Sequence, residues 1–288
     1  MNEPLVSVVM PAFNSAKWIA DAIRSIQSQT YINWELLVVD DGSTDNTVEK
    51  IESLFEDERI RIFSQNNSGP AVARNLGIEE AKGEFLAFLD ADDMWFKDKL
   101  NLQLEHLLSN PGLGLVHSGY RVFIDDPHSN KSFRAPGWFA EWHESERLLV
   151  CDTIGTLTVM TRTELVRQVG GFREGLFGTE DWDLWIRVSK LAEIFKLKTE
   201  LACYRIHSSG ISQSVPEHFQ ELEKVYNSHA FQPDVHRRIQ HGARAVLSLR
   251  QGKQEFLAFS LISGFLKALQ GGFHWITATY YLNKNQEQ

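Results

Sequence analysis

Residues 35–45 read Glu35-Leu36-Leu37-Val38-Val39-Asp40-Asp41-Gly42-Ser43-Thr44-Asp45, an apolar run that ends in an acidic turn. The same arrangement recurs in residues 85–93, which read Phe85-Leu86-Ala87-Phe88-Leu89-Asp90-Ala91-Asp92-Asp93. A short apolar run bounded by turn residues is typical of a buried strand. The two stretches therefore predict two strands, each followed by a turn that carries carboxylates.

The segments around these runs alternate between strand and helix patterns. An apolar run predicts a further strand at residues 5–10, and another strand is predicted at 59–63. Helical spacing of apolar residues predicts helices at 16–27, 45–55 and 70–81. Such alternation predicts an α/β fold with a mostly parallel central sheet flanked by helices. Ligands of such sheets bind beyond the carboxyl ends of the strands, which is where both acidic turns lie. Turn and helix-capping chemistry explains either turn alone, but explains two at one edge less well.

The overall composition excludes several classes of protein. The 288 residues are 43% hydrophobic and 23% charged, as in an ordinary globular protein, and the net charge of −9 argues against nucleic acid as a partner. Two cysteines, Cys151 and Cys203, are too few for a disulfide framework and indicate a reducing compartment. The N-terminal residues lack the pattern of a secretory signal, and the apolar stretch 256–282 is interrupted by polar residues. We therefore expect a cytoplasmic location.

The carboxylate turns differ in the chemistry that they predict. Asp90 and Asp92, separated by one small residue, can converge on one hard cation, and Mg²⁺ or Mn²⁺ completes such a shell with phosphate oxygens and water. A carboxylate at the end of a strand, such as Asp40, can instead accept an N–H of a nucleotide base. The glycine-rich phosphate loops of NTPases and dinucleotide dehydrogenases do not occur in the sequence.

Five strings of residues, in order, make the sequence resemble glycosyltransferase family 2, whose catalytic domain has the GT-A nucleotide-diphospho-sugar transferase fold. The resemblance covers about residues 4 to 210. The strings are Val8-Val9-Met10-Pro11-Ala12-Phe13-Asn14, Val39-Asp40-Asp41-Gly42-Ser43-Thr44-Asp45, Gly69-Pro70-Ala71-Val72-Ala73-Arg74-Asn75-Leu76-Gly77, Phe88-Leu89-Asp90-Ala91-Asp92-Asp93 and Thr179-Glu180-Asp181-Trp182-Asp183-Leu184-Trp185.

The resemblance implies a nucleotide and metal site. Pro11, Phe13 and Asp40 match the pocket for the base, and Asp41, Arg74, Asp90 and Ala91 join the nucleotide-binding set. For Arg74 a role as an ion-pair partner stays open. Asp90 and Asp92 match the D-x-D metal motif, with Asp92 as the direct ligand, Asp93 as a candidate to share it, and His207 as a further metal candidate that an ordinary histidine would also explain.

The resemblance also implies an inverting transfer of a sugar to a hydroxyl acceptor. Asp181 matches the general base, while Glu180, Trp182 and Trp95 are candidates for acceptor binding. Acidic residues at the start of a helix would also explain Glu180 and Asp181, and a core position would explain Trp182 or Trp185. Asp183 falls on another face of the helix and is expected to be structural. The implied partners are a nucleotide-diphospho-sugar, such as a UDP-sugar, and a glycan or lipid-linked saccharide.

The chain is expected to divide into a catalytic domain at 1–215 and a helical appendage at 216–288. Basic residues and the apolar stretch 256–269 leave three uses of this appendage open: packing on the catalytic domain, homodimerisation, and peripheral contact with the inner face of an anionic membrane. Packing is the default. Trp138 and Trp142 lie in a segment, 125–146, that resembles a loop over the acceptor side.

Two other classes of function remain as alternatives. One is a sugar-nucleotide or glycan-binding module without turnover, which the loss of Asp181 or Asp92 would have suggested, although both are present. The other is a sugar nucleotidyltransferase, which needs an early glycine-rich, basic loop for a triphosphate. Residues 8–20 contain Lys17 alone as a basic residue and no glycine.

Overall fold

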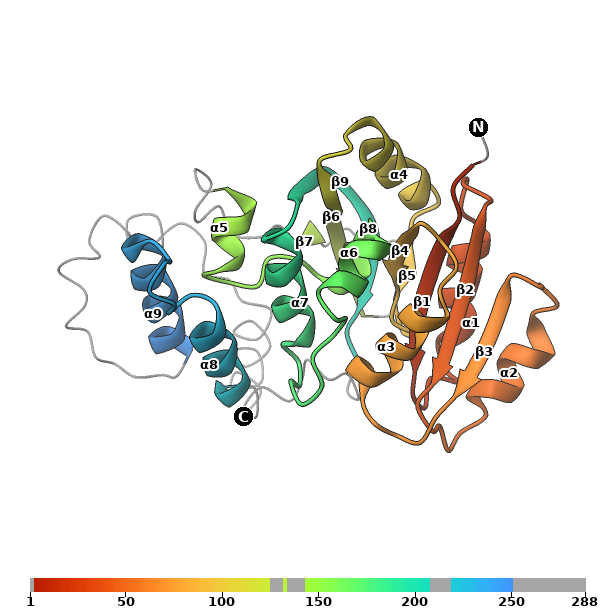
Figure 1. The fold of residues 1–288 in the computed structure, drawn as a ribbon. Coiled ribbons are helices and arrows are strands. Elements are labelled where there is room, and N and C mark those ends of the chain that lie inside the picture. Colours follow the sequence, from red (N-terminus) through yellow and green to blue (C-terminus); the bar gives the residue numbers. More distant parts are fainter. Residues whose placement is uncertain (1–2, 125–131, 134–142, 208–218, 251–288) are drawn as a thin grey trace.

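The computed structural model describes residues 3–124, 132–133, 143–207 and 219–250. The first half of the chain forms the predicted alternation (Figure 1), with bounds within a few residues of those expected. Its elements are β1 (Val6–Ala12), α1 (Ile19–Gln27), β2 (Trp34–Asp40), α2 (Thr47–Leu54), β3 (Ile60–Ser64), α3 (Pro70–Glu80) and β4 (Phe85–Phe88). The strands β2 and β4 are buried at every residue, as expected for strands covered by helices on both faces.

The second half adds strands that make the sheet mixed. They are β5 (Met94–Trp95), β6 (Leu113–Phe123), β7 (Ser132–Phe133), β8 (Met160–Arg162) and β9 (Glu193–Arg205). The strand order is β3-β2-β1-β4-β8-β6-β9-β5, with β7 paired to β6. The first four strands are parallel, as predicted, whereas β8 runs antiparallel to both β4 and β6. The exposed polar residues of β9 explain why its start lacks a strand-like apolar run.

The helices complete two hydrophobic cores on opposite faces of the sheet. Val8 belongs to one core and Val9 to the other, because successive residues of a strand point to opposite faces. The later helices are α4 (Lys99–Ser109), α5 (Glu144–Leu148), the 3-10 turn η1 (Thr156–Thr158), α6 (Thr163–Gln168) and α7 (Glu180–Ser189).

Two helices of the C-terminal segment, α8 (Phe219–Ser228) and α9 (Arg237–Arg250), lie at the opposite end of the molecule from β3 and α2 (Figure 1). Val225 and Tyr226 of α8 share a core with Trp182 of α7, so this part of the segment packs on the preceding fold. Trp138, Trp142 and the stretch 256–269 lie outside the described residues. Within the described ranges, no helix is both long and apolar enough to cross a membrane.

Candidate functional site

The strands β1, β2 and β4 end at one edge of the sheet, and this edge carries the predicted donor site. Ala12 at the end of β1 is in register with Asp40 at the end of β2, and Asp41 donates its backbone N–H to the Ala12 carbonyl at 2.8 Å. The strand β4 lies on the other side of β1, with Phe88 in register with Val9. The tertiary fold thus brings the turns after Asp40 and after Phe88 to the same edge.

One carboxylate oxygen of Asp40 is suited to accept a hydrogen bond from a ligand. The side chain is buried, and Oδ2 accepts the backbone N–H of Ser43 at 3.3 Å, but Oδ1 has no hydrogen-bond partner within the described part of the chain. An unpaired buried acceptor is costly, so an N–H of a base edge is a suitable partner for it. Phe13 is 49% exposed at the same edge, as a surface for a nucleotide base requires. Pro11 is part of β1, opposite Val39.

Asp41 has a structural role. Its Oδ1 accepts the backbone N–H of Ser68 and the side-chain amide of Gln65, at 2.8 and 2.7 Å, and its Oδ2 accepts the N–H of Gly69 at 2.8 Å. These bonds hold the loop before α3. Its predicted contact with a nucleotide stays a prediction.

Asn14, which sequence reasoning did not assign, joins the loops that follow β1 and β2. Its side-chain carbonyl accepts the backbone N–H groups of Thr44 and Asp45, at 2.8 and 3.3 Å, and its own N–H donates to Ser43 Oγ at 2.9 Å. The backbone of Asn14 is left-handed, with φ of 49°, which asparagine tolerates better than most residues. These bonds hold together the two loops beside the predicted base pocket.

The predicted metal motif lies against the end of β9. Asp92 Oδ2 is 2.7 Å from His207 Nε2, although the residues are 115 positions apart. Arg205 makes this approach possible, because its backbone N–H donates to Asp93 Oδ1 and its Nε donates to the Asp92 carbonyl, both at 2.8 Å. Asp93 is buried, and its Oδ2 has no hydrogen-bond partner among the described residues. Ala91 is also buried, so its side chain packs in the core.

These residues fit a divalent cation whose coordination shell is completed by a bound ligand. Burial and the neighbouring Asp90 raise the pKa of Asp92, and the contact with His207 opposes this increase. A cation held by Asp92 would offset the repulsion between the carboxylates of Asp92 and Asp90. No group of three or more metal-binding side chains is assembled within the described ranges. Mg²⁺ and Mn²⁺ need only one or two protein ligands where phosphate oxygens supply others.

Arg74 links the metal motif to the helix that carries Asp181. Its Nη2 is 2.7 Å from Asp90 Oδ1 and its Nη1 is 2.9 Å from Glu180 Oε1. The guanidinium is buried. Burial alone would lower the pKa of Arg74, but the two carboxylates outweigh it and raise that pKa. Of the two roles left open for Arg74, the structure shows the ion pairs.

Asp181 lies in the first turn of α7 and is partly buried. Its Oδ2 accepts a hydrogen bond from Thr156 Oγ1 at 2.5 Å, and its Oδ1 accepts the backbone N–H of Trp182 at 2.8 Å. Burial and the adjacent Glu180 raise the pKa of Asp181 to about 6, against the lowering effects of Thr156 and Arg74. A carboxylate with this pKa is a suitable general base near neutral pH. The sequence carried no signal for Thr156.

The tryptophans that were expected to contact an acceptor belong to the core. Trp182 is 1% exposed and donates Nε1–H to the Leu148 carbonyl at 2.6 Å, while Trp95 is 4% exposed and donates to the Leu157 carbonyl at 2.8 Å. Neither ring presents a face to solvent, so the structure does not support stacking of these rings on a sugar. Glu180 is occupied by Arg74 at Oε1, and acceptor binding by its other oxygen stays a prediction.

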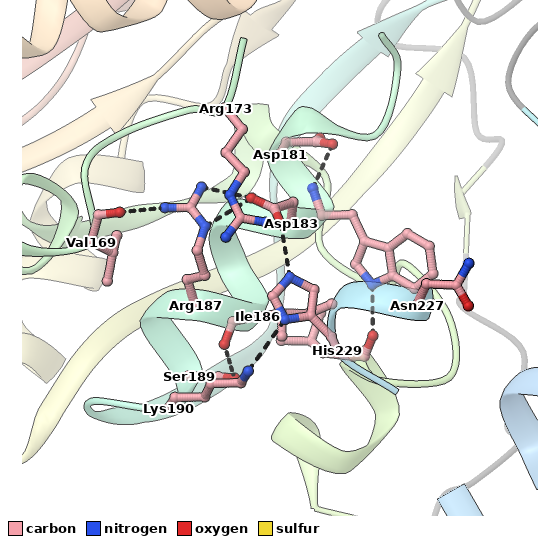
Figure 2. A network of polar contacts seen from close by, with 12 residues as sticks. Val169, Arg173, Asp181, Asp183, Ile186, Arg187, Ser189, Lys190, Asn227 and His229 are labelled. Carbon is pink, nitrogen blue, oxygen red and sulfur yellow. Dashed lines mark hydrogen bonds and ion pairs between the residues drawn. The ribbon is translucent and has the colours of Figure 1, made fainter. Parts of the chain in front are cut away.

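Asp183 is structural, as expected from its place on the helix. Figure 2 shows it between Arg173, Arg187 and His229, apart from Asp181. Its Oδ1 is 2.9 Å from Arg173 Nη1, and its Oδ2 is 2.7 Å from Arg187 Nη2. Burial would raise the pKa of Asp183, but the hydrogen bond from His229 and the two arginines outweigh it and lower that pKa. This group anchors α7 on the side of the helix away from Asp181.

Comparison with known sequences identifies a family. Residues 7–166 match the model of glycosyl transferase family 2. The UDP-Glc:alpha-D-GlcNAc-diphosphoundecaprenol beta-1,3-glucosyltransferase WfgD of Escherichia coli is 34% identical over 230 residues, which cover 79% of this chain and 86% of WfgD. An uncharacterized glycosyltransferase of Rickettsia felis is 35% identical over 212 residues. That match covers 72% of this chain but only 34% of the Rickettsia protein, so the chain spans about a third of the length of such relatives.

Comparison with solved structures identifies the fold. S. aureus TarS in complex with UDP-GlcNAc has a TM-score of 0.69 at 18% identity, with 90% of this chain and 76% of that chain covered. The mannosyltransferase PcManGT from Pyrobaculum calidifontis, in complex with GDP-Man and Mn²⁺, has a TM-score of 0.66 at 20% identity, with 93% and 81% covered. The shared architecture is the expected GT-A fold.

Proposed function

The chain belongs to glycosyl transferase family 2, and on this premise we propose that it transfers a sugar from a nucleotide-diphospho-sugar to a hydroxyl group of an acceptor, with inversion at the anomeric carbon. The observation that carries the proposal is the bridge made by Arg74. Its guanidinium binds Asp90 of the predicted donor site and Glu180, the neighbour of Asp181. The buried guanidinium of Arg74 thus joins the residues proposed to bind the leaving diphosphate to the helix that carries the proposed general base.

In the proposed mechanism the nucleotide base lies at Asp40 and Phe13, where Asp40 Oδ1 accepts an N–H of the base. Asp92, with Asp90 and His207, would hold Mn²⁺ or Mg²⁺. When bound, this cation would neutralise charge on the departing diphosphate. Asp181 removes the proton of the acceptor hydroxyl as its oxygen attacks the anomeric carbon from the face opposite the diphosphate.

The relatives suggest the class of donor and acceptor. WfgD is named for a UDP-Glc donor and a diphosphoundecaprenol-linked acceptor, and TarS was solved with UDP-GlcNAc. We therefore infer a UDP-sugar as the donor and a glycan or lipid-linked saccharide as the acceptor. A cytoplasmic protein in peripheral contact with the inner face of the membrane would reach such a lipid-linked acceptor.

The experiment that tests the function is incubation with a panel of sugar nucleotides, with and without Mn²⁺ and with saccharide acceptors. Release of UDP together with a glycoside product supports a transferase, and an α-linked UDP-sugar should give a β-glycoside, as judged by the anomeric proton coupling in NMR. Binding without turnover would instead support a binding module. Formation of a sugar nucleotide and pyrophosphate from UTP and a sugar phosphate would support a nucleotidyltransferase.

A further inference from the structure

Three successive carbonyl oxygens around η1 each accept a hydrogen bond from a buried side chain. Trp95 Nε1 donates to Leu157 O at 2.8 Å, Gln103 Nε2 donates to Thr158 O at 2.7 Å, and Lys99 Nζ donates to Val159 O at 3.2 Å. The donors come from β5 and α4, which directly follow the turn of Asp90–Asp93. We call Trp95, Lys99 and Gln103 the donor triad.

The donor triad is linked within itself and lies inside the core. Lys99 Nζ also donates to Gln103 Oε1 at 2.5 Å and lies 4.3 Å from the centroid of the Trp95 ring. Lys99 and Gln103 are fully buried, and Trp95 is 4% exposed. Burial lowers the pKa of Lys99 well below its usual value. An apolar side chain would fill the position of Lys99 without this cost, so a role for its hydrogen bonds has to be sought.

The turn that the donor triad holds carries the hydroxyl group that contacts Asp181. Thr158 binds the Gly155 carbonyl twice, through its N–H at 2.9 Å and its Oγ1 at 2.6 Å, and Val159 N donates to Thr156 O at 3.1 Å. These bonds make the turn a rigid unit. Thr156, its first residue, donates Oγ1–H to Asp181 Oδ2. A displacement of the turn would therefore displace the hydroxyl group.

We propose that Trp95, Lys99 and Gln103 are positioning residues for the general base, because they fix the turn of Thr156–Thr158 and through the Thr156 hydroxyl fix the carboxylate of Asp181. This inference rests on the proposed function in that it takes Asp181 as the base. It also connects the segment after the metal motif with the acceptor side by a route separate from the Arg74 bridge.

The groups that face Asp181 allow the contribution of the turn to be isolated. Glu180 on the same helix raises the pKa of Asp181, whereas Arg74 from α3, the Thr156 hydroxyl and the N–H of Trp182 lower it. Arg74 is held by Asp90 and Glu180, neither of which contacts η1 through a hydrogen bond in the described residues. A change in the donor triad should therefore alter the hydroxyl contact and leave the charges in place.

The test measures the ionisation of Asp181 in two ways: from the acidic limb of the pH dependence of kcat for transfer, and from the ¹³C carboxyl resonance in the protein without donor. Thr156→Val should move both upward by about 0.5 to 1 pH unit, because a hydrogen bond to the charged form is lost. Thr156→Ser should restore both. Gln103→Met should move them in the same direction by a smaller amount, and lower kcat more than it raises KM for the acceptor.

Two matched controls separate positioning from general loss of stability. Gln29 is a buried glutamine whose amide donates to Phe96 O and accepts from Leu100 N, so that it binds the start of α4 but not the turn. Gln29→Met should lower the melting temperature about as much as Gln103→Met without moving the acidic limb. Thr161→Val removes a buried hydroxyl that donates to Gly114 O, and it should likewise leave the acidic limb of the pH dependence unchanged.

The inference is overturned if Asp181 has the same pKa in folded Gln103→Met as in Gln29→Met, while the pKa of Asp181 is raised in Thr156→Val. Should Gln103→Met fail to fold, Trp95→Phe removes the donor to Leu157 together with part of the buried ring and is expected to give the same upward shift; an unshifted Trp95→Phe overturns the inference equally. Failure of the proposed function has a different signature, namely no transfer by the parent protein or full transfer by Asp181→Asn. In that case the ¹³C titration still tests the positioning of Asp181.

Discussion

His229 Nε2 lies 2.8 Å from Asp183 Oδ1, so a residue just after α8 is hydrogen-bonded to the helix that carries Asp181 (Figure 2). Lys190 Nζ is 3.2 Å from His229 Nδ1 and has no lone pair to accept with, so the ring proton is on Nε2 and points to Asp183. Both His229 and Asp183 are buried. The C-terminal segment is thereby joined to α7 by a polar contact as well as by apolar packing.

The first prediction concerns this contact. His229→Leu removes a donor from a buried carboxylate, and we expect the free energy of unfolding in urea to fall by about 2 kcal/mol. His241→Leu, at an exposed histidine of α9, is the matched control and should change it by less than about 0.5 kcal/mol. Equal effects of the two substitutions would show that the contact adds no stability.

The second prediction separates two adjacent carboxylates. Asp40→Asn should weaken the binding of UDP by about tenfold or more even without a metal, since the lost interaction is a charge-assisted hydrogen bond to the base. Asp41→Asn should mainly lower the stability, because Asp41 holds Gln65, Ser68 and Gly69. Calorimetry and thermal unfolding distinguish the two outcomes. An unchanged metal-free affinity in Asp40→Asn would remove Asp40 from the base pocket.

The third prediction concerns the cation. Asp92→Ala should reduce the Mn²⁺-dependent part of UDP binding by at least about tenfold and leave metal-free binding nearly unchanged, because its carboxylate is the predicted direct ligand. Glu52→Gln, an exposed substitution on α2, controls for the change in charge. If Asp92→Ala binds UDP with Mn²⁺ as tightly as the parent protein in calorimetry, the metal assignment is wrong.

The fourth prediction is the pH dependence of transfer. Because burial raises the pKa of Asp181 to about 6 and a base must be deprotonated, kcat should rise with pH through about 6 and then level off. At pH 5 the rate should be about one tenth of the plateau. Asp181→Asn should retain donor binding, lose transfer by about 10²-fold or more, and lose this limb of the profile.

The control for this profile is donor and metal binding, measured by calorimetry at each pH and kept saturating. Protonation of the metal motif would otherwise also lower the rate in acid. A limb that is unchanged in Asp181→Asn would assign the titration to another group and would require a different base.

The sequence by itself determined the first four strands and the edge that carries the acidic turns of the predicted donor site. Short apolar runs, helical spacing and the rule for the ends of parallel strands depend on neighbours in the chain, and they placed Asp40 and Asp90–Asp93 correctly at one edge. The family strings then selected Asp181 among the acidic residues of its helix. Asp183 was separated from it by helical geometry alone.

Only the tertiary structure decided which side chains meet. Arg74 and Glu180 are 106 positions apart, and Thr156 and Asp181 are 25 apart, so no local pattern marks either contact. The same reason explains why Trp95, which the sequence analysis assigned to acceptor binding, is instead enclosed by the turn of Thr156–Thr158 and by Lys99. An aromatic ring has the same composition whether it is covered or exposed, and what covers it is set by packing between distant segments.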